Sequence, residues 1–254
     1  MADLWAHREV LSMLARKDFQ TRYKRATFGV LWAVVVPVLQ AAVMAVVFSR
    51  VIRVETGVNF AAYVMSGILM WAYFAATLNT GATAIVDGSG LTDKVWFPRA
   101  VLVFVPSLAN LVGLGISFAA LLVILPILGV GLGVHLLLIF PAALLLVTFT
   151  TALTMVLAAL HVYFRDVRYL VQAALLVWLY VTPIIYPKTL LGKLAPLADF
   201  NPMTGVVSLF HLAALGREPQ WERPVLVSVV VTIALTAAAV EVHRRRDRLF
   251  VDQL

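Results

Sequence analysis

Residues that commonly perform catalysis are present in this chain, but their spacing matches no common active site. The pairs His7–Glu9 and His243–Glu241 stand two residues apart, and residues two apart on a helix point in different directions. The phosphate-binding pattern G-x-x-x-x-G-K-[ST], the zinc-protease pattern H-E-x-x-H and the hydrolase pattern G-x-S-x-G are absent, and the chain has no cysteine. The sequence therefore argues against an enzyme, and it predicts no catalytic residue, no metal site and no cofactor bound by this chain.

Charged side chains that could bind a partner are concentrated in short segments. Between residues 56 and 164 all of them lie in one island, Asp87–Arg99, which reads DGSGLTDKVWFPR. Ser89 is a helix-capping residue type and proline ends helices, so the island predicts a short helix that stops before Pro98. Its apolar residues could dock into a cleft of a partner, and an ordinary loop packed on a bilayer surface is the alternative. The predicted docking residues are Leu91, Lys94, Val95, Phe97, Pro98 and Arg99.

Two further charged clusters stand beside long apolar segments. The first is strongly basic, and clustered Arg and Lys bind phosphate groups well, so it could hold a lipid diphosphate head group. The alternative is that it serves only as a positive anchor at the membrane interface. The second is a smaller polar loop later in the chain. The residues concerned are Arg22, Tyr23, Lys24 and Arg25 in the first cluster, and Arg165 and Asp166 in the second.

Aromatic and hydroxyl side chains inside the apolar segments offer a different chemistry. Aromatic rings stack on the apolar faces of sugar rings, so a helix face that mixes aromatics with threonine could line a conduit for sugars. The alternative is ordinary helix packing, with threonine hydroxyls bonded to the backbone. The channel-lining candidates are Trp71, Tyr73, Phe74, Thr77, Trp178 and Tyr180.

Long apolar segments must position all of these residues. The chain has 254 residues, of which 62% are hydrophobic and only 13% are charged, whereas a soluble domain has about 25% charged residues. The chain is therefore predicted to be an all-α polytopic membrane protein. Residues 2–20 place apolar and charged side chains on different sides of a helix, which is typical of an amphipathic helix lying in the membrane interface.

Six apolar stretches approach the roughly 20 helical residues that cross a bilayer. A seventh crossing is disfavoured by charge, because with six spans 14 of the 20 Lys and Arg residues share one side with both termini, and such residues mark the cytoplasmic side. The predicted outer side then carries a region with re-entrant helices between spans 5 and 6. The full prediction is one transmembrane domain, 1–254, with an interfacial helix and elbow at 1–25, six transmembrane helices at 26–49, 58–85, 101–126, 135–161, 169–187 and 224–241, a coupling loop at 87–99 and the outer re-entrant region at 188–223.

The predicted spans contain no obvious machinery for ion-coupled transport. Proton- and sodium-driven transporters carry ionisable groups inside their spans, and no Asp, Glu, Lys or Arg interrupts the six apolar runs. Energy for any transport is therefore expected to come from another protein, which favours the docking interpretation of Asp87–Arg99.

Several stretches, in order along the chain, resemble the permease subunits of type-2 ABC exporters that carry O-antigen, teichoic acid, galactan and similar lipid-linked polysaccharides. Segment 16–37 resembles that family's R-D-x-x-x-R-Y-x-x-S-x-L-G-x-x-W-x-x-x-x-P signature, with Lys17 standing before the Asp where Arg is usual. Segment Leu91–Arg99 resembles the family's L-x-x-K-x-x-F-P-R loop. The other similar stretches are Gly67–Trp71, Tyr163–Val167, Thr182–Pro187, Asn201–Thr204 and Leu249–Leu254.

The resemblance implies a transport permease in the bacterial cytoplasmic (inner) membrane, with both termini cytoplasmic. Two copies of the chain would form a homodimer with two copies of a separate ABC ATPase, which would bind ATP and magnesium and dock on the coupling helix. The implied cargo is a polyprenyl-diphosphate-linked polysaccharide moved to the outer side of the lipid bilayer, and no nucleic acid is expected as a partner. The alternative on the same scaffold is an exporter of a drug or a small lipid.

Overall fold

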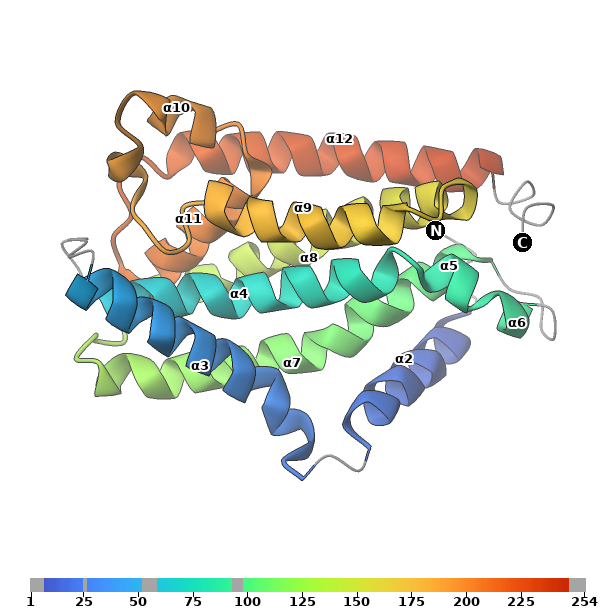
Figure 1. The fold of residues 1–254 in the computed structure, drawn as a ribbon, viewed down its shortest axis with the longest axis horizontal. Coiled ribbons are helices and arrows are strands. Elements are labelled where there is room, and N and C mark those ends of the chain that lie inside the picture. The colour runs from blue at the N-terminus through green and yellow to red at the C-terminus, as the bar shows by residue number, and fades with distance from the viewer. Residues whose placement is uncertain (1–6, 25–26, 52–58, 93–97, 247–254) are drawn as a thin grey trace.

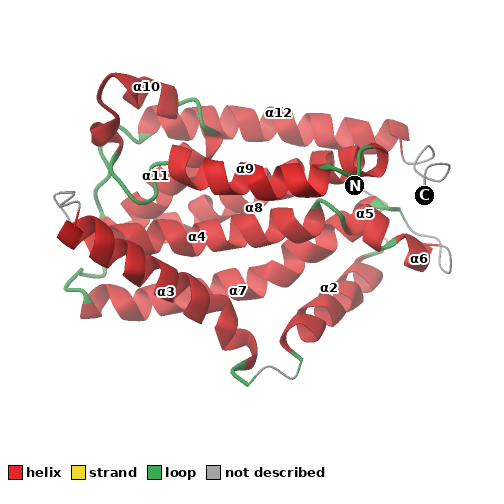
Figure 2. Cartoon of the chain, in the orientation of Figure 1, coloured by secondary structure: helices red, strands yellow, loops and turns green. Residues whose placement is uncertain are grey.

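The computed structural model describes residues 7–24, 27–51, 59–92 and 98–246, and these residues form helices joined by turns, with no strand among them. Figure 1 shows the long helices running side by side along one axis of the molecule, and Figure 2 shows how little of the chain between them is loop. The expectation of an all-helical protein is therefore confirmed for this part of the chain.

Five helical segments are long and apolar enough to cross a membrane, by length and composition. They overlap the predicted spans 1, 2, 3, 4 and 6. The elements that form them are η1 (Gly29–Leu31), α3 (Trp32–Val46) and η2 (Val47–Val51) for the first, α4 (Phe60–Gly81) for the second, α7 (Ala100–Ile127) for the third, η3 (Val134–Leu138) and α8 (Ile139–Tyr163) for the fourth, and α12 (Glu222–Arg246) for the last.

The fifth predicted span contains a shorter helix, α9 (Val167–Val181). Its 15 residues rise about 22 Å at 1.5 Å per residue, which is less than the roughly 30 Å of a hydrocarbon core. The helix ends because Thr182 is extended, as expected for the residue before Pro183. Five candidate spans are thus present, and a sixth crossing stays a prediction.

The helix α2 (Arg8–Tyr23) precedes the first candidate span and is inclined to the main bundle in Figure 1. Its apolar residues Leu11 and Leu14 pack against Val101 at the start of α7. The predicted amino-terminal helix is therefore present and is attached to the bundle by its apolar side.

Short helices cover the two ends of the bundle. The connection between α9 and α12 contains η4 (Lys188–Leu194), α10 (Ala195–Ala198) and α11 (Pro202–Leu215), and α11 is buried against α4, α8 and α12. The helices α5 (Ala84–Asp87) and α6 (Ser89–Thr92) lie at the opposite end, as Figure 1 shows. Backbone that dips into a membrane needs protein around it, and α11 has such cover, although its re-entrant position stays a prediction.

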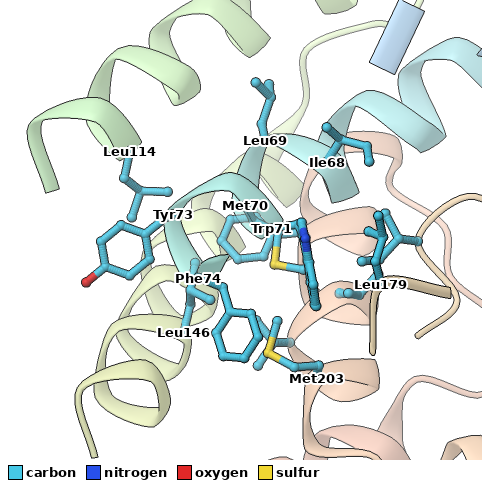
Figure 3. Packing of buried hydrophobic residues seen from close by; sticks show 14 of the residues in the cluster. Ile68, Leu69, Met70, Trp71, Tyr73, Phe74, Leu114, Leu146, Leu179 and Met203 are labelled. Atoms are coloured by element: carbon cyan, nitrogen blue, oxygen red, sulfur yellow. The ribbon is translucent and has the colours of Figure 1, made fainter. Parts of the chain in front are cut away.

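The helix α4 is the centre of the molecule. In its most apolar window 78% of the residues are buried, whereas no other candidate span exceeds 33%. It contacts α3, α7, α8, α9 and α11, and Figure 3 shows Tyr73 pointing to the Leu114 side of α4 and Trp71 to the Leu179 side. Because α4 is enclosed by its own chain, it is the scaffold on which the other helices are placed.

Candidate functional site

A chain of polar contacts links the amino-terminal basic cluster to the interior of the bundle. The Arg22 guanidinium forms an ion pair with Asp18 at 2.8 Å and donates from Nη1 to Asn110 Oδ1 at 2.8 Å. Asn110 in turn donates from Nδ2 to Thr77 Oγ1 at 3.1 Å. Thr77 is fully buried in α4, so one arginine of the predicted head-group site is joined to one of the channel-lining candidates.

A small cavity of about 180 Å³ lies beside these contacts, between α3, α4 and α7. Arg22, Tyr73 and Asn110 are among its lining residues. The Tyr73 hydroxyl does not remain free, because it donates to the backbone carbonyl of Ser107 at 3.3 Å, and the Thr151 hydroxyl donates to Ser107 Oγ at 3.1 Å. These bonds tie α4, α7 and α8 together in the middle of the bundle.

Two of the aromatic candidates on α4, Trp71 and Phe74, lie in one cluster with Trp178 of α9. Phe74 lies 5.0 Å from Trp71, 5.3 Å from Trp178 and 6.0 Å from Phe149, measured between ring centroids. The ring of Trp178 stands edge-on to that of Phe74, an arrangement that aromatic pairs prefer. Within one copy of the chain these rings pack against each other, which agrees with the helix-packing interpretation. A role in lining a channel stays a prediction.

The indole of Trp178 is also fixed by a hydrogen bond at the start of α11. Its Nε1 donates to Asn201 Oδ1 at 2.9 Å, while Asn201 Nδ2 donates to Thr182 Oγ1 at 2.9 Å. The same Asn201 oxygen accepts the amide of Met203 and so caps α11. One asparagine therefore joins the end of α9 to the beginning of α11.

Tyr180 differs from the other candidates because its side chain is 55% exposed. It shares α9 with the exposed apolar residues Leu176 and Val177, and α3 likewise presents exposed Trp32 and Leu39. In a membrane such faces must meet lipid or a second protein chain.

Sequence reasoning missed an ion-pair cluster at the α10–α11 end of the bundle. Lys188 Nζ lies 2.6 Å from Asp199 Oδ1 and also donates to the Gln220 carbonyl at 3.2 Å. Arg223 approaches the other carboxylate oxygen of Asp199 at 3.9 Å and stacks over Phe200. The side chains of Lys188 and Asp199 are only 10% and 9% exposed. The cluster fastens η4 and α10 to the first turn of α12.

A second missed group lies where α4 meets α11. The ring of Tyr63 lies against that of His211, with 3.8 Å between centroids and an angle of 32° between the ring planes, and His211 Nδ1 lies 3.5 Å from Glu218 Oε2. Gly67 permits this approach, because a Cβ there would stand 3.2 Å from His211 Nε2 and 2.9 Å from the Ile184 side chain. The family-like Gly67–Trp71 stretch therefore begins at a point where α4 and α11 are in close contact.

The predicted docking residues are described only in part. Leu91 belongs to α6, and Pro98 and Arg99 are half-buried just before α7, while Lys94, Val95 and Phe97 lie outside the described residues. Their assignment to an ATPase contact stays a prediction.

The remaining candidates that the structure describes lie at the end of α2 and in the turn between α8 and α9. Tyr23 is the last residue of α2, Lys24 is exposed, and Arg25 lies outside the described residues. Arg165 and Asp166 are exposed in the turn between α8 and α9. Among residues 7–24, 27–51, 59–92 and 98–246, no group of three His, Asp or Glu side chains is arranged to hold a metal ion.

Known proteins resemble this chain along most of its length. The family model described as "ABC-2 type transporter" matches residues 9–214. The chain is 28% identical over 255 residues to the O-antigen export system permease protein RfbA of Myxococcus xanthus, with 99% of this chain and 98% of that protein covered. It is also 25% and 26% identical to two proteins of the same name from Klebsiella pneumoniae, over 78% of this chain and 77% of theirs. The chain therefore belongs to the ABC-2 type transporter family.

Proposed function

We propose that this chain is the membrane subunit of an ATP-driven exporter that moves a lipid-linked polysaccharide of the O-antigen, galactan or teichoic-acid type to the outer side of the bacterial inner membrane. The observation that carries the proposal is its similarity to the Myxococcus permease over 99% of its length. The similarity runs along the whole chain, so it involves more than a shared content of apolar segments.

Six crossings, with both termini cytoplasmic, agree best with the distribution of Lys and Arg residues along the chain. The apolar helix α9 together with residues 182–187 provides the additional crossing. An even number of spans places α2, the α5–α6 end and the basic end of α12 on one side, the side that Lys and Arg mark as cytoplasmic. The outer side then carries η4, α10 and α11, with α11 covered by its own chain in the way a re-entrant helix requires.

The energy source is a separate ABC ATPase. Coupling passes through the segment Asp87–Arg99, because it is next to α7, the helix that also carries Asn110 and Ser107. A rigid shift of α7 would be transmitted to Thr77 and Tyr73 of α4 through the hydrogen bonds from Asn110 and to the Ser107 carbonyl.

The polysaccharide crosses between two copies of the chain. Since α4 is enclosed within one copy, a conduit built from the exposed faces of α3 and α9, including Tyr180, needs a second copy opposite. Lys24 and Arg25 bind the diphosphate of the polyprenyl carrier at the cytoplasmic interface. Arg22 positions this cluster through its bonds to Asp18 and Asn110.

Coexpression with the partner ATPase tests the proposal. In a bacterium that lacks its own O-antigen exporter, the pair should restore polysaccharide at the cell surface. Leu91→Asp combined with Phe97→Asp should abolish export, while Leu132→Asp, an exposed residue of the loop after α7, should leave it intact. Drug resistance without surface polysaccharide would contradict the proposal that the cargo is a polysaccharide. Full export by the double variant would contradict the assignment of Leu91 and Phe97 to the ATPase contact.

A further inference from the structure

A second and larger cavity lies away from α3, α4 and α9. It has a volume of about 550 Å³ and is lined by α7, α8 and α12 together with Pro98. The helix α8 packs against both α7 and α12 and forms the floor of the cavity, while Figure 1 shows α7 and α12 on opposite sides of α8. This cavity shares no lining residue with the smaller one beside Arg22 and Tyr73.

The cavity has the depth of one leaflet. Along α7 its wall extends from Ala100 to Leu111, which is about 16 Å at 1.5 Å per residue. Along α12 it extends from Thr236 to Arg244, or about 12 Å. Half of a hydrocarbon core is roughly 15 Å. The cavity therefore begins at the end of the bundle that carries α5 and α6 and ends near the middle of the membrane.

Most of the wall is apolar, and its bonded hydroxyls need no water. Phe104, Leu108 and Met155 are among the lining residues. The hydroxyl of Thr151 donates to Ser107 Oγ, and that of Thr236 donates to the Thr232 carbonyl. Because these donors are used within the protein, the cavity suits a hydrocarbon chain better than ordered water.

Positive charge stands at the mouth. Arg244 lines the cavity and is exposed, and the lining residues include no carboxylate. Arg99 lies between the lining residues Pro98 and Ala100, and its buried Nη1 donates no hydrogen bond within the described part of the chain. Basic pockets between membrane helices on the cytoplasmic side bind anionic lipid head groups.

We propose that this cavity binds one anionic glycerophospholipid of the cytoplasmic leaflet, with an acyl chain along α8 and the phosphate at Arg244. The site is distinct from the conduit for the cargo. The polyprenyl chain of the carrier is longer than one leaflet is deep, so a cavity that ends at mid-membrane fits an acyl chain better. Such a lipid fills the space between α7 and α12 and holds their spacing.

Lipid retention by the purified full-length chain tests the site without requiring export. In native mass spectrometry with phosphatidylglycerol or phosphatidylcholine, the protein should retain one phosphatidylglycerol per chain under detergent washing that removes phosphatidylcholine. Leu108→Trp, which fills the cavity, should lower retention at least about tenfold, and Arg244→Gln about fivefold. The matched controls Leu122→Trp, exposed on the same helix outside the cavity, and Arg217→Gln, exposed at the opposite end, should retain the lipid as the unaltered chain does.

Four results would each overturn the proposal. The first is equal retention of the two phospholipids, which would remove the role of Arg244. The second is unchanged retention in Leu108→Trp, which would place the lipid elsewhere. The third is displacement of phosphatidylglycerol by added polyprenyl phosphate, which would assign the cavity to the carrier. The fourth is loss of dimers without loss of lipid in Leu108→Trp, which would assign the cavity to a second copy of the chain.

Discussion

The helix α4 and the segment Gly29–Ser49, which contains α3, are both uncharged and long enough to cross a membrane, yet they have opposite surroundings. The most apolar window of α4 is 78% buried within its own chain, and that of Gly29–Ser49, which contains α3, is 22% buried. In α4 even the polar side chains Tyr73 and Thr77 have partners from neighbouring helices. In α3 most of the exposed side chains, such as Leu39 and Val43, are aliphatic.

This difference in burial indicates that α4 acts as a scaffold within the chain and that α3 presents a surface to its surroundings. A helix enclosed by its neighbours is held by many contacts and moves only with them, whereas a helix with an unpartnered apolar face can meet lipid or another chain with little change in its own packing. Substitutions in α4 should therefore act mainly on stability, and substitutions on the exposed faces of α3 and α9 should act mainly on assembly and transport.

The largest effect on stability is expected for Phe74→Ala, because Phe74 is fully buried and contacts three other rings. We expect a loss of about 3 kcal/mol, the low end for a buried Phe→Ala change, since the unfolded chain keeps its ring in lipid. Leu39→Ala, at a site 58% exposed on α3, should change the free energy of unfolding by less than about 0.5 kcal/mol. Reversible unfolding in bicelles measures both values. Equal losses would mean that the burial contrast between α4 and α3 does not hold in the membrane.

Asp199→Asn tests whether the ion pair with Lys188 holds η4 and α10 in place as firmly as packing holds α4. The substitution leaves Lys188 buried without its carboxylate, although Lys188 still donates to the Gln220 carbonyl. We expect a loss of about 2 kcal/mol, the low end for a broken buried charge pair. The effect should persist at high salt, because buried pairs are screened little. A control variant, Asp166→Asn in the exposed turn before α9, should unfold like the unaltered chain.

The sequence was sufficient to predict where the helices lie, for a physical reason. Proline, glycine and charge limit apolar helices locally, so the prediction for span 3, 101–126, differs little from α7, Ala100–Ile127. The helix α9 ends earlier than the predicted 169–187 because an uncharged run is not always helical, and Pro183 stops this one. Local signals of this kind need no knowledge of the fold.

The contacts of the candidate site could not be predicted in the same way. Arg22 and Asn110 are 88 residues apart, and Tyr63 meets His211 across an even longer separation. Nothing in the local pattern indicates such pairs, because they depend on how helices pack. The same limit left two interpretations open for Trp71, Tyr73 and Phe74, and within one chain the structure places all three in packed surroundings. Of the predicted channel-lining residues, only Tyr180, on the exposed face of α9, is free to line a surface shared with another molecule.

Thr77→Val tests whether α4, in addition to its structural role, is coupled to movement of α7. The change removes the acceptor for Asn110 Nδ2, and we expect a loss of about 1 kcal/mol because interhelical hydrogen bonds in membranes are weak. Thr80→Val is the matched control, since the exposed Thr80 hydroxyl bonds only to the Ala76 carbonyl of its own helix. If α7 couples ATP hydrolysis to α4 through Asn110, Thr77→Val should also lower export per ATP hydrolysed, and Thr80→Val should not. An unchanged export ratio in Thr77→Val would leave that contact with a structural role alone.

The smallest effect on stability is expected for Tyr180→Ala. This variant tests whether an exposed face affects export without affecting stability. The Tyr180 side chain is 55% exposed, so its removal should change the free energy of unfolding by less than about 0.5 kcal/mol. If sugar rings pass along this face of α9, export should fall by several-fold because a stacking ring is lost. Tyr169→Ala, at the other end of α9 and 66% exposed, should leave both quantities unchanged. A loss of export in Tyr169→Ala equal to that in Tyr180→Ala would mean that the face of α9 matters as a whole, as in a contact between two copies, and that Tyr180 has no particular role in the conduit.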